Sequence, residues 1–289
     1  MTQYEHVRRP AAAGMFYDGE PERLETSIRG YLAKADPEKP SGPVIALISP
    51  HAGYPFSGQA AAYGFKLLGP QRIQRVLVVA PSHRTRFHGV SIPSVEAYET
   101  PLGLISLDTK ACNNLLTQNT LFSNVPEAHG QEHSLEVQLP FLQVVLKDFE
   151  MVPMVVGQLN GSDSKNIAKA LRGIIKQDDV FIASSDFVHQ GPRFGYVPYN
   201  KNIRENIRDL DMGAVDLILQ KDSPGFMQYV RDTGATICGS APISILLDIL
   251  PEQAKGTLLT YYTSADVLGD ETETVSYASI AFENGSGWD

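Results

Sequence analysis

Residues 76–83 read VLVVAPSH, five apolar residues followed by Pro, Ser and His. Short apolar runs rich in Val and Ile that end in Pro, Ser or Gly are typical of buried strands. The pattern occurs twice more, where ALISPHAG delivers His51 and where VFIASSDFVH delivers Asp186 and His189. In open α/β sheets, ligands bind in the crevice beyond the carboxyl ends of the strands. The sequence therefore predicts that three strands bring their histidines to one shared site.

Strands and helices are expected to alternate along most of the chain, which is the pattern of a layered α/β protein. The expected strands cover residues 44–49, 75–80, 150–156, 179–184, 256–263 and 275–283. The expected helices cover residues 20–34, 57–68 with Ser57 as the cap, 108–118, 133–147 with either a kink or a new turn at Pro140, 163–176, 200–220 and 241–250. Residues 89–93 and 103–107 are expected to form a hairpin-like insert. Because no segment has the composition of a domain linker, we predict one domain over residues 1–289, a sandwich around a central, mostly parallel or mixed sheet.

The composition supports a full-sized hydrophobic core and an acidic surface. Of the 289 residues 43% are hydrophobic, and 33 Asp and Glu outnumber 24 Lys and Arg, giving a net charge of -9. The sequence contains no basic cluster that would neutralise phosphates, which argues against a nucleic-acid partner. Two cysteines make no disulfide framework, and no segment resembles a signal peptide or a membrane span of ~18 apolar residues. We therefore expect a cytoplasmic protein without a membrane partner.

Histidines at the ends of these runs predict a metal site, since imidazole is the commonest protein metal ligand. His51 and His83 each follow an apolar run. Cys238 stands in ICGSAP, directly before an expected helix. The positive end of that helix would lower the pKa of the thiol and favour the thiolate, which is both a nucleophile and a metal ligand. The alternative for Cys238 is a buried structural cysteine, which is also the interpretation of Cys112 inside its amphipathic segment.

Asp186 and His189 form a D-x-x-H pair just after the third apolar run. On a helical turn this spacing places both side chains on one face, where the carboxylate would fix the tautomer of the imidazole and raise its basicity. Such a histidine suits a general base. The alternative is that Asp186 caps a turn and His189 lies merely nearby.

Residues 129–136 read HGQEHSLE and are dense in potential ligands. His129, Glu132 and His133 match the pattern H-x-x-E-H of some zinc peptidases, which places its ligands on a helix. Gly130 is a poor residue for the interior of such a helix. The segment therefore leaves two interpretations open, a zinc peptidase-like hydrolase and a helix start with Glu132 and Glu136 near its positive end.

Seven segments resemble, in order, the sequences of the Memo family. They are RPAAAGMFYDG near the start, ISPHAGYPFSG, APSHR, EHSLEVQLPFL, SSDFVH, CGSAPI and the closing YYTSAD with VSYASIAF. The family has bacterial and archaeal members and is similar in fold to the class III extradiol-cleaving dioxygenases. The resemblance therefore implies the fold of the catalytic subunit of these dioxygenases over nearly the whole chain.

The resemblance also implies roles for individual residues. His51, His83 and Cys238 would form the metal site, with Cys238 at the position where the related dioxygenases hold iron with a glutamate. His189 would match the acid/base histidine of the dioxygenases, with Asp186 beside it. The residues that would line the same pocket are Glu132, His133 and Arg84.

Two imidazoles and a thiolate form a softer ligand set than two imidazoles and a carboxylate, so the set suits copper or zinc and also admits iron. The implied function is a metal-dependent oxidoreductase with dioxygenase-like activity on a small molecule. The alternative is a non-catalytic module that captures a peptide or protein in the former catalytic cleft. Eukaryotic members are implicated in cell migration, redox biology and phosphotyrosine-peptide binding. Bacterial and archaeal relatives are often encoded near a radical-SAM protein, which implies a functional link to such a protein.

Overall fold

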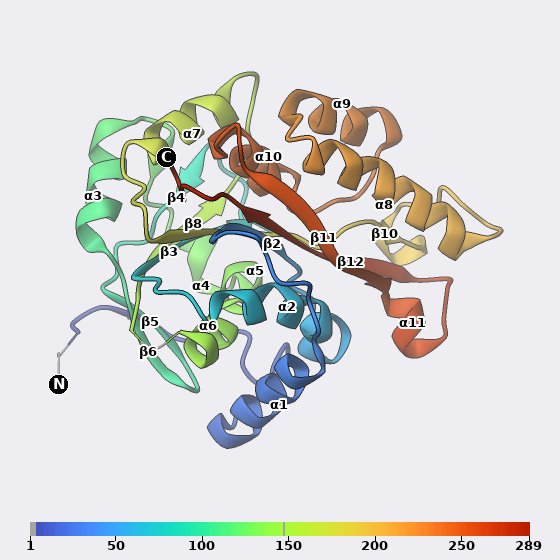
Figure 1. Ribbon diagram of the computed structural model, residues 1–289, viewed down its shortest axis with the longest axis horizontal. Coiled ribbons are helices and arrows are strands. Elements are labelled where there is room, and N and C mark those ends of the chain that lie inside the picture. Colours follow the sequence, from blue (N-terminus) through green and yellow to red (C-terminus); the bar gives the residue numbers. More distant parts are fainter. Residues whose placement is uncertain (1–3, 147) are drawn as a thin grey trace.

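The computed structural model describes residues 4–146 and 148–289, with a mixed sheet running through the middle (Figure 1). Its strands lie side by side in the order β10 (His189–Gln190), β12 (Thr274–Glu283), β2 (Val44–Ser49), β9 (Asp179–Ser184), β3 (Arg75–Pro81), β8 (Glu150–Val156), β4 (Val90–Ser91) and β7 (Phe122–Ser123). A further strand, β11 (Lys255–Thr263), pairs with β12. The predicted α/β class with a mixed central sheet is confirmed.

The centre of the sheet is parallel and its flanks are antiparallel. β2, β9, β3 and β8 run in the same direction, while β12 is antiparallel to β2 and β4 is antiparallel to β8. Every residue of β2, β3 and β9 is buried, as expected for apolar strands covered on both faces. Because these three strands are parallel neighbours, their carboxyl ends meet at one edge of the sheet.

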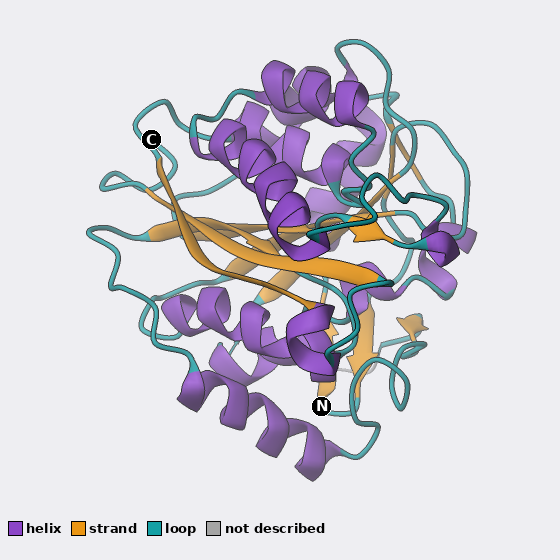
Figure 2. Cartoon of the chain, turned by 90° about the vertical axis from the view of Figure 1, so that its right-hand side faces the viewer, coloured by secondary structure: helices purple, strands orange, loops and turns teal. Residues whose placement is uncertain are grey.

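Helices cover both faces of the sheet (Figure 2). One face is packed by α1 (Pro21–Lys34), α2 (Tyr54–Leu68) and α6 (Leu139–Val145), which share a core containing Leu24, Phe65 and Phe141. The other face is packed by α3 (Thr109–Gln118), α7 (Asp163–Arg172), α8 (Ile203–Leu219), α9 (Ser223–Thr233) and α10 (Ser240–Ile249). The remaining helical segments are the short α4 (Glu127–Gly130), α5 (His133–Glu136), η1 (Pro192–Phe194) and α11 (Ser264–Leu268).

A small separate sheet holds the N-terminal arm. Its strands lie in the order β1 (Val7–Arg8), β5 (Ala97–Thr100) and β6 (Gly103–Ser106), with β1 parallel to β5. The predicted pairing of residues 89–93 with 103–107 is wrong, because β6 pairs with β5 and β4 joins the main sheet. The connection between β5 and β6 is two residues long, and such a short loop makes the nearest strand the partner.

Helix starts were the least accurate part of the sequence prediction. α2 begins at Tyr54 with Gly53 as its N-cap, so Ser57 lies inside the helix and is not the cap. The predicted helix over 133–147 is instead two helices, α5 and α6, within the described residues. Pro140 lies in the first turn of α6, where proline is tolerated, so the expected alternative that Pro140 begins a new turn is confirmed and no mid-helix kink forms.

Two further helices differ at their ends or were missed. α7 ends at Arg172, four residues earlier than predicted, and Gly173 is its C-cap. α9 was not predicted, although Asp222 accepts a hydrogen bond from the backbone N–H of Gly225 and a proline follows at the start of the helix. The sequence Asp222-Ser223-Pro224 therefore carried an N-cap signal with proline in the first turn.

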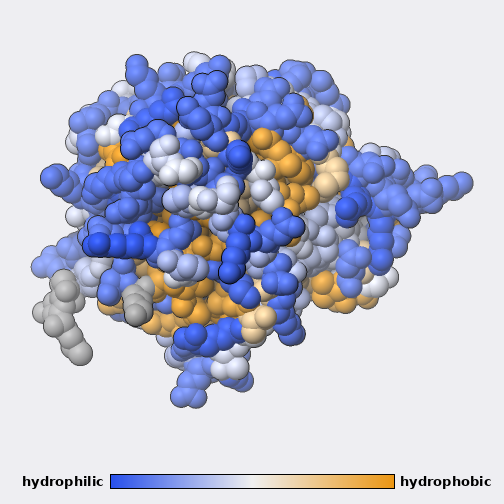
Figure 3. Space-filling view, in the orientation of Figure 1, coloured by the Kyte–Doolittle hydropathy of each residue, from blue (hydrophilic) through white to orange (hydrophobic). Residues whose placement is uncertain are grey.

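No helix in the described parts of the chain is long and apolar enough to cross a bilayer. On the face seen in Figure 3, hydrophilic residues dominate the periphery and apolar residues show mainly toward the centre of the view.

Candidate metal centre

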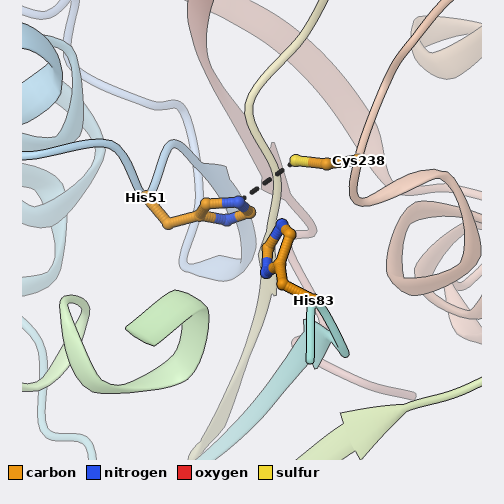
Figure 4. Close-up of side chains that lie close together, drawn as sticks. All are labelled: His51, His83 and Cys238. Carbon is orange, nitrogen blue, oxygen red and sulfur yellow. Dashed lines mark hydrogen bonds between the residues drawn. The ribbon is translucent and has the colours of Figure 1, made fainter. Parts of the chain in front are cut away.

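Two of the three histidines predicted to share a site, His51 and His83, lie at the same edge of the sheet, together with Asp186 of the third run. His189 lies in β10 (His189–Gln190) and is not part of the group of potential metal ligands found among the described residues. His51 follows β2, His83 follows β3, and Asp186 follows β9, which lies between them. Cys238 reaches this edge from the loop before α10. Figure 4 shows the Cys238 sulfur and one ring nitrogen of each histidine pointing toward one another.

The geometry of this cluster suits a metal ion. One ligand atom from each of His51, His83 and Cys238 lies within 4.8 Å of the others, and Cys238 Sγ is 3.1 Å from His51 Nε2. Three protein ligands are the set found in catalytic zinc sites, which keep one coordination position for water or substrate. Imidazole and thiolate ligands are also those of soft copper sites.

The His51 ring is held in one tautomer by a neutral hydrogen-bond network. Its Nδ1 lies 2.9 Å from Ser184 Oγ, while that hydroxyl donates to the Ser134 carbonyl at 2.6 Å. Gln138 Nε2 donates to Ser184 Oγ at 2.7 Å. Because the hydroxyl proton is already used, His51 Nδ1 must be the donor, and the lone pair is left on Nε2 beside the sulfur. Burial and the neighbouring histidines hold the pKa of His51 well below its usual value, so the ring is neutral.

The His83 ring is oriented by a carboxylate. Its Nδ1 donates to Glu132 Oε1 at 2.9 Å, which leaves Nε2 free. The same carboxylate accepts the backbone N–H of His83 at 2.7 Å and of Ser134 at 3.0 Å. Burial alone would raise the pKa of Glu132, but the hydrogen bond and charge of His83 and the two N–H donors lower it to about 2. A carboxylate behind the far nitrogen of a histidine is the usual support of a metal-bound imidazole.

Cys238 differs from the sequence expectation in its acidity. Burial, together with the negative charge of Asp186, raises the pKa of the thiol well above its usual value. The expected net lowering by the helix terminus is wrong, because burial and Asp186 outweigh the backbone N–H of Gly239, the N-cap of α10, which does act to lower the pKa. A cation held here would bind the thiolate, so the Cys238 thiol would lose its proton on metal binding. The fit of the three residues to a metal ion rests on their donor atoms lying within 4.8 Å of one another.

Asp186 and His189 do not form the predicted hydrogen-bonded pair among the described residues. The chain is extended after β9, so the helical spacing does not apply. Asp186 Oδ1 instead accepts the backbone N–H groups of His51 at 2.8 Å and Ala52 at 3.3 Å. His189 Nδ1 lies 2.8 Å from the Phe187 carbonyl and must donate to it, which leaves Nε2 as the basic nitrogen. A backbone carbonyl therefore fixes the tautomer that the carboxylate was expected to fix.

The H-x-x-E-H pattern is not assembled as a peptidase motif. α4 and α5 are separate short helices, and Glu132 is the N-cap of α5. The His129 ring bonds Tyr98 Oη at 2.9 Å and Ser91 Oγ at 3.0 Å. Because His129 is engaged elsewhere, the helical zinc ligand set that a zinc peptidase requires is absent from this segment.

The other residues expected to line the pocket lie around His83. Glu132 and His133 form a second group with His83 in which the potential ligand atoms lie within 4.8 Å of one another. The His133 ring stacks on the His83 ring with centroids 4.8 Å apart. Burial and the charges of His83 and Arg84 lower the pKa of His133 to about 4. Arg84 itself is exposed.

Sequence reasoning missed three residues that shape this site. Ser184 and Gln138 orient His51, and Phe16 stacks on His133 with ring centroids 4.2 Å apart. Each lies in one of the segments that resemble the Memo family, but the residue types alone gave no chemical signal.

A family model described as Memo-like protein matches residues 8–281. The chain belongs to the Memo family. It is 32% identical to the Protein memo-1 homolog of Caenorhabditis elegans, over 95% of this chain and 82% of that protein. It is 31% identical to Protein MEMO1 of Danio rerio, over 95% of this chain and 96% of that protein, and 32% identical to a MEMO1 family protein of Methanopyrus kandleri, over 96% and 99%.

Among solved structures, the Memo chain is similar to an uncharacterized protein of Escherichia coli K12. The TM-score is 0.55 at 16% sequence identity, over 82% of this chain and 99% of that chain. At this identity the likeness shows the shared α/β fold alone.

Proposed function

We propose that this Memo-family protein is a metal-dependent oxidoreductase whose ion is held by His51, His83 and Cys238. The observation that carries the proposal is the fixed tautomer of each ring: Nδ1 of both histidines donates to a protein oxygen. The Nε2 atoms therefore carry the lone pairs on the side of the Cys238 sulfur, which is hydrogen-bonded to His51 Nε2 at 3.1 Å. A soft site of this kind favours copper or zinc and admits iron. A bound copper or iron ion would supply the redox chemistry that activates dioxygen or a bound substrate.

The chain's own residues would bind the ion and move protons. Because His189 Nδ1 donates to the Phe187 carbonyl, the neutral ring carries its lone pair on Nε2, which would accept a proton as a general base. Asp186 holds the backbone at His51 in place through two N–H groups. It also places a buried carboxylate oxygen 4.0 Å from His51 Nε2, where it would offset the charge of a cation.

The proposal is tested by measuring metal content by mass spectrometry on protein purified aerobically and anaerobically. We expect near-stoichiometric copper or iron in the wild type and its loss in Cys238→Ala and His51→Ala. Cys112→Ala is the matched control, because Cys112 is the other cysteine and lies buried in the core among apolar residues.

Unchanged metal content in both site variants would overturn the assignment. Absence of metal from every wild-type preparation, with no uptake on titration, would favour the peptide- or protein-binding alternative. In that case the metal-free protein would be screened for partners.

A further inference from the structure

A buried ion pair joins the N-terminal arm to the segment that carries Glu132. Arg8, in β1, is 6% exposed, and its guanidinium pairs with the fully buried carboxylate of Glu136 in α5. Its Nε and Nη2 also donate to the His129 carbonyl at 3.1 and 3.0 Å, and Nη2 donates to the Glu132 carbonyl at 2.9 Å. One guanidinium therefore fixes three points of the segment 129–136.

Glu136 also holds the N-terminal arm through hydrogen bonds to residues that follow Arg8. Its carboxylate accepts the backbone N–H of Ala11 at 2.8 Å and of Ala12 at 2.9 Å, and it also accepts the Tyr17 hydroxyl. The arm between these contacts carries Phe16, whose ring lies on His133. The ion pair thus holds in place both the backbone of Glu132 and the part of the arm that carries Phe16, which packs on His133.

We propose that the Arg8–Glu136 pair is a positioning device for the metal centre: it holds Glu132 where its carboxylate keeps His83 Nε2 turned toward His51 and Cys238. This inference rests on the proposed metal site. The contact that transmits the effect is the hydrogen bond from Arg8 to the Glu132 carbonyl, since the side chain of the same residue accepts the His83 Nδ1 proton.

A stabilising role alone does not account for this pair well. Removing two charges from water costs about as much free energy as their mutual attraction returns, and apolar replacements are often neutral or stabilising. The Arg8 guanidinium also donates to backbone carbonyls of the segment 129–136, which carries Glu132. A planar guanidinium with several N–H donors fixes the geometry of the groups that it binds.

A second buried arginine with carboxylate partners, Arg75, lies at the opposite end of β3 from His83 and serves as the control. Arg75 is 4% exposed and bonds the Asp179 carboxylate, Asp108 Oδ2 at 2.7 Å and the Ile174 carbonyl at 2.6 Å. Arg75 and Arg8 are thus alike in burial and in bonding both carboxylates and carbonyls. Arg75 begins the strand that His83 follows, so its contacts lie away from the metal ligands.

The experiment compares Arg8→Lys with Arg75→Lys, because lysine keeps the positive charge but lacks the planar guanidinium that donates to several groups at once. We expect both variants to melt at lower temperature than the wild type. Arg8→Lys should also bind Co²⁺ up to about 10-fold more weakly, because Arg8 acts through Glu132, and losing a residue that directly supports a metal-bound histidine costs about 10–100-fold. Arg75→Lys should bind Co²⁺ as the wild type does. The readout is titration monitored by the sulfur-to-cobalt charge-transfer absorption of the folded protein below its melting temperature.

A second readout needs no metal. The ¹⁵N chemical shifts of His83 in the metal-free protein report its tautomer, and we expect one tautomer in the wild type and Arg75→Lys but a mixture in Arg8→Lys. If Arg8→Lys does not fold, Tyr17→Phe, which removes one donor to Glu136, should change both readouts in the same direction by less.

Wild-type Co²⁺ affinity together with unchanged His83 shifts in Arg8→Lys would overturn the inference. A wild type that binds no Co²⁺ would instead overturn the proposed function, and the metal-free shifts would still decide whether Arg8 positions His83.

Discussion

His51 and His83 follow two parallel strands with the same sequence pattern, yet the protein holds the two rings by different means. His51 is 2% exposed and donates to the neutral hydroxyl of Ser184, whereas the His83 side chain is 31% exposed and donates to the ionised carboxylate of Glu132. A fully buried ring is kept neutral and oriented by a neutral partner. The ring near the surface has a charged partner that makes it a more basic ligand.

The comparison predicts that the largest effect on metal binding from outside the ligands comes from Glu132→Gln. The amide removes the charge behind His83 and leaves one of three convergent N–H donors without an acceptor. We expect metal affinity to fall about 10–100-fold. Competition with a chromophoric chelator measures the change. The comparison fails if Glu132→Gln retains wild-type affinity.

Ser184→Ala should act mainly on stability. It leaves the buried Nδ1–H of His51 without its acceptor, and a buried unsatisfied donor costs about 1–3 kcal/mol. We expect the free energy of unfolding in urea to fall by that amount, with a smaller loss of metal affinity than in Glu132→Gln, since burial still confines the ring. Ser244→Ala is the control, because this buried hydroxyl donates to the Ala241 carbonyl within α10. A Ser184→Ala protein as stable as the wild type would contradict this account of His51.

Acidification should lower the free energy of unfolding of the metal-free protein first through its buried histidines, and through Glu132 only at lower pH. Burial lowers the pKa of His129 to about 4, and His133 behaves likewise, so the folded state binds fewer protons than the unfolded state below about pH 6.5. Stability is fully present above that pH and is lost toward pH 4, at about 1.4 kcal/mol per pH unit for each group. The pKa of Glu132, lowered to about 2, adds a loss only below about pH 4.5.

Urea unfolding of the metal-free protein at pH 7.5, 6 and 5 measures this dependence. His129→Gln is a suitable variant because His129 lies outside the candidate ligand set, and we expect it to show a shallower dependence than the wild type. Equal stability of the wild type at all three values would show that the buried histidines are not held neutral.

The sequence was sufficient where the signal was local. Each apolar run becomes a buried strand, and parallel neighbours necessarily bring His51, His83 and Asp186 to one edge. The sequence did not predict side-chain contacts between residues that are distant along the chain. His83 and Glu132, whose side chains are hydrogen-bonded, are 49 residues apart, and Arg8 and the Glu132 carbonyl that it binds are 124 residues apart.

Two chemical expectations failed because they depend on surroundings that only the fold defines. The acidity of Cys238 follows from its burial beside Asp186 and is opposite to what a helix terminus predicts. The peptidase-like pattern failed because two short helices replace one, and His129 turns to Tyr98 and Ser91.

X-ray absorption spectroscopy of the protein loaded with Zn²⁺ as a probe tests the metal centre most directly. The account predicts one sulfur at about 2.3 Å and imidazole nitrogens at about 2.0 Å around the ion, with the sulfur lost in Cys238→Ala. A wild-type spectrum with nitrogen and oxygen neighbours but no sulfur would contradict the assignment of His51, His83 and Cys238 as the ligands.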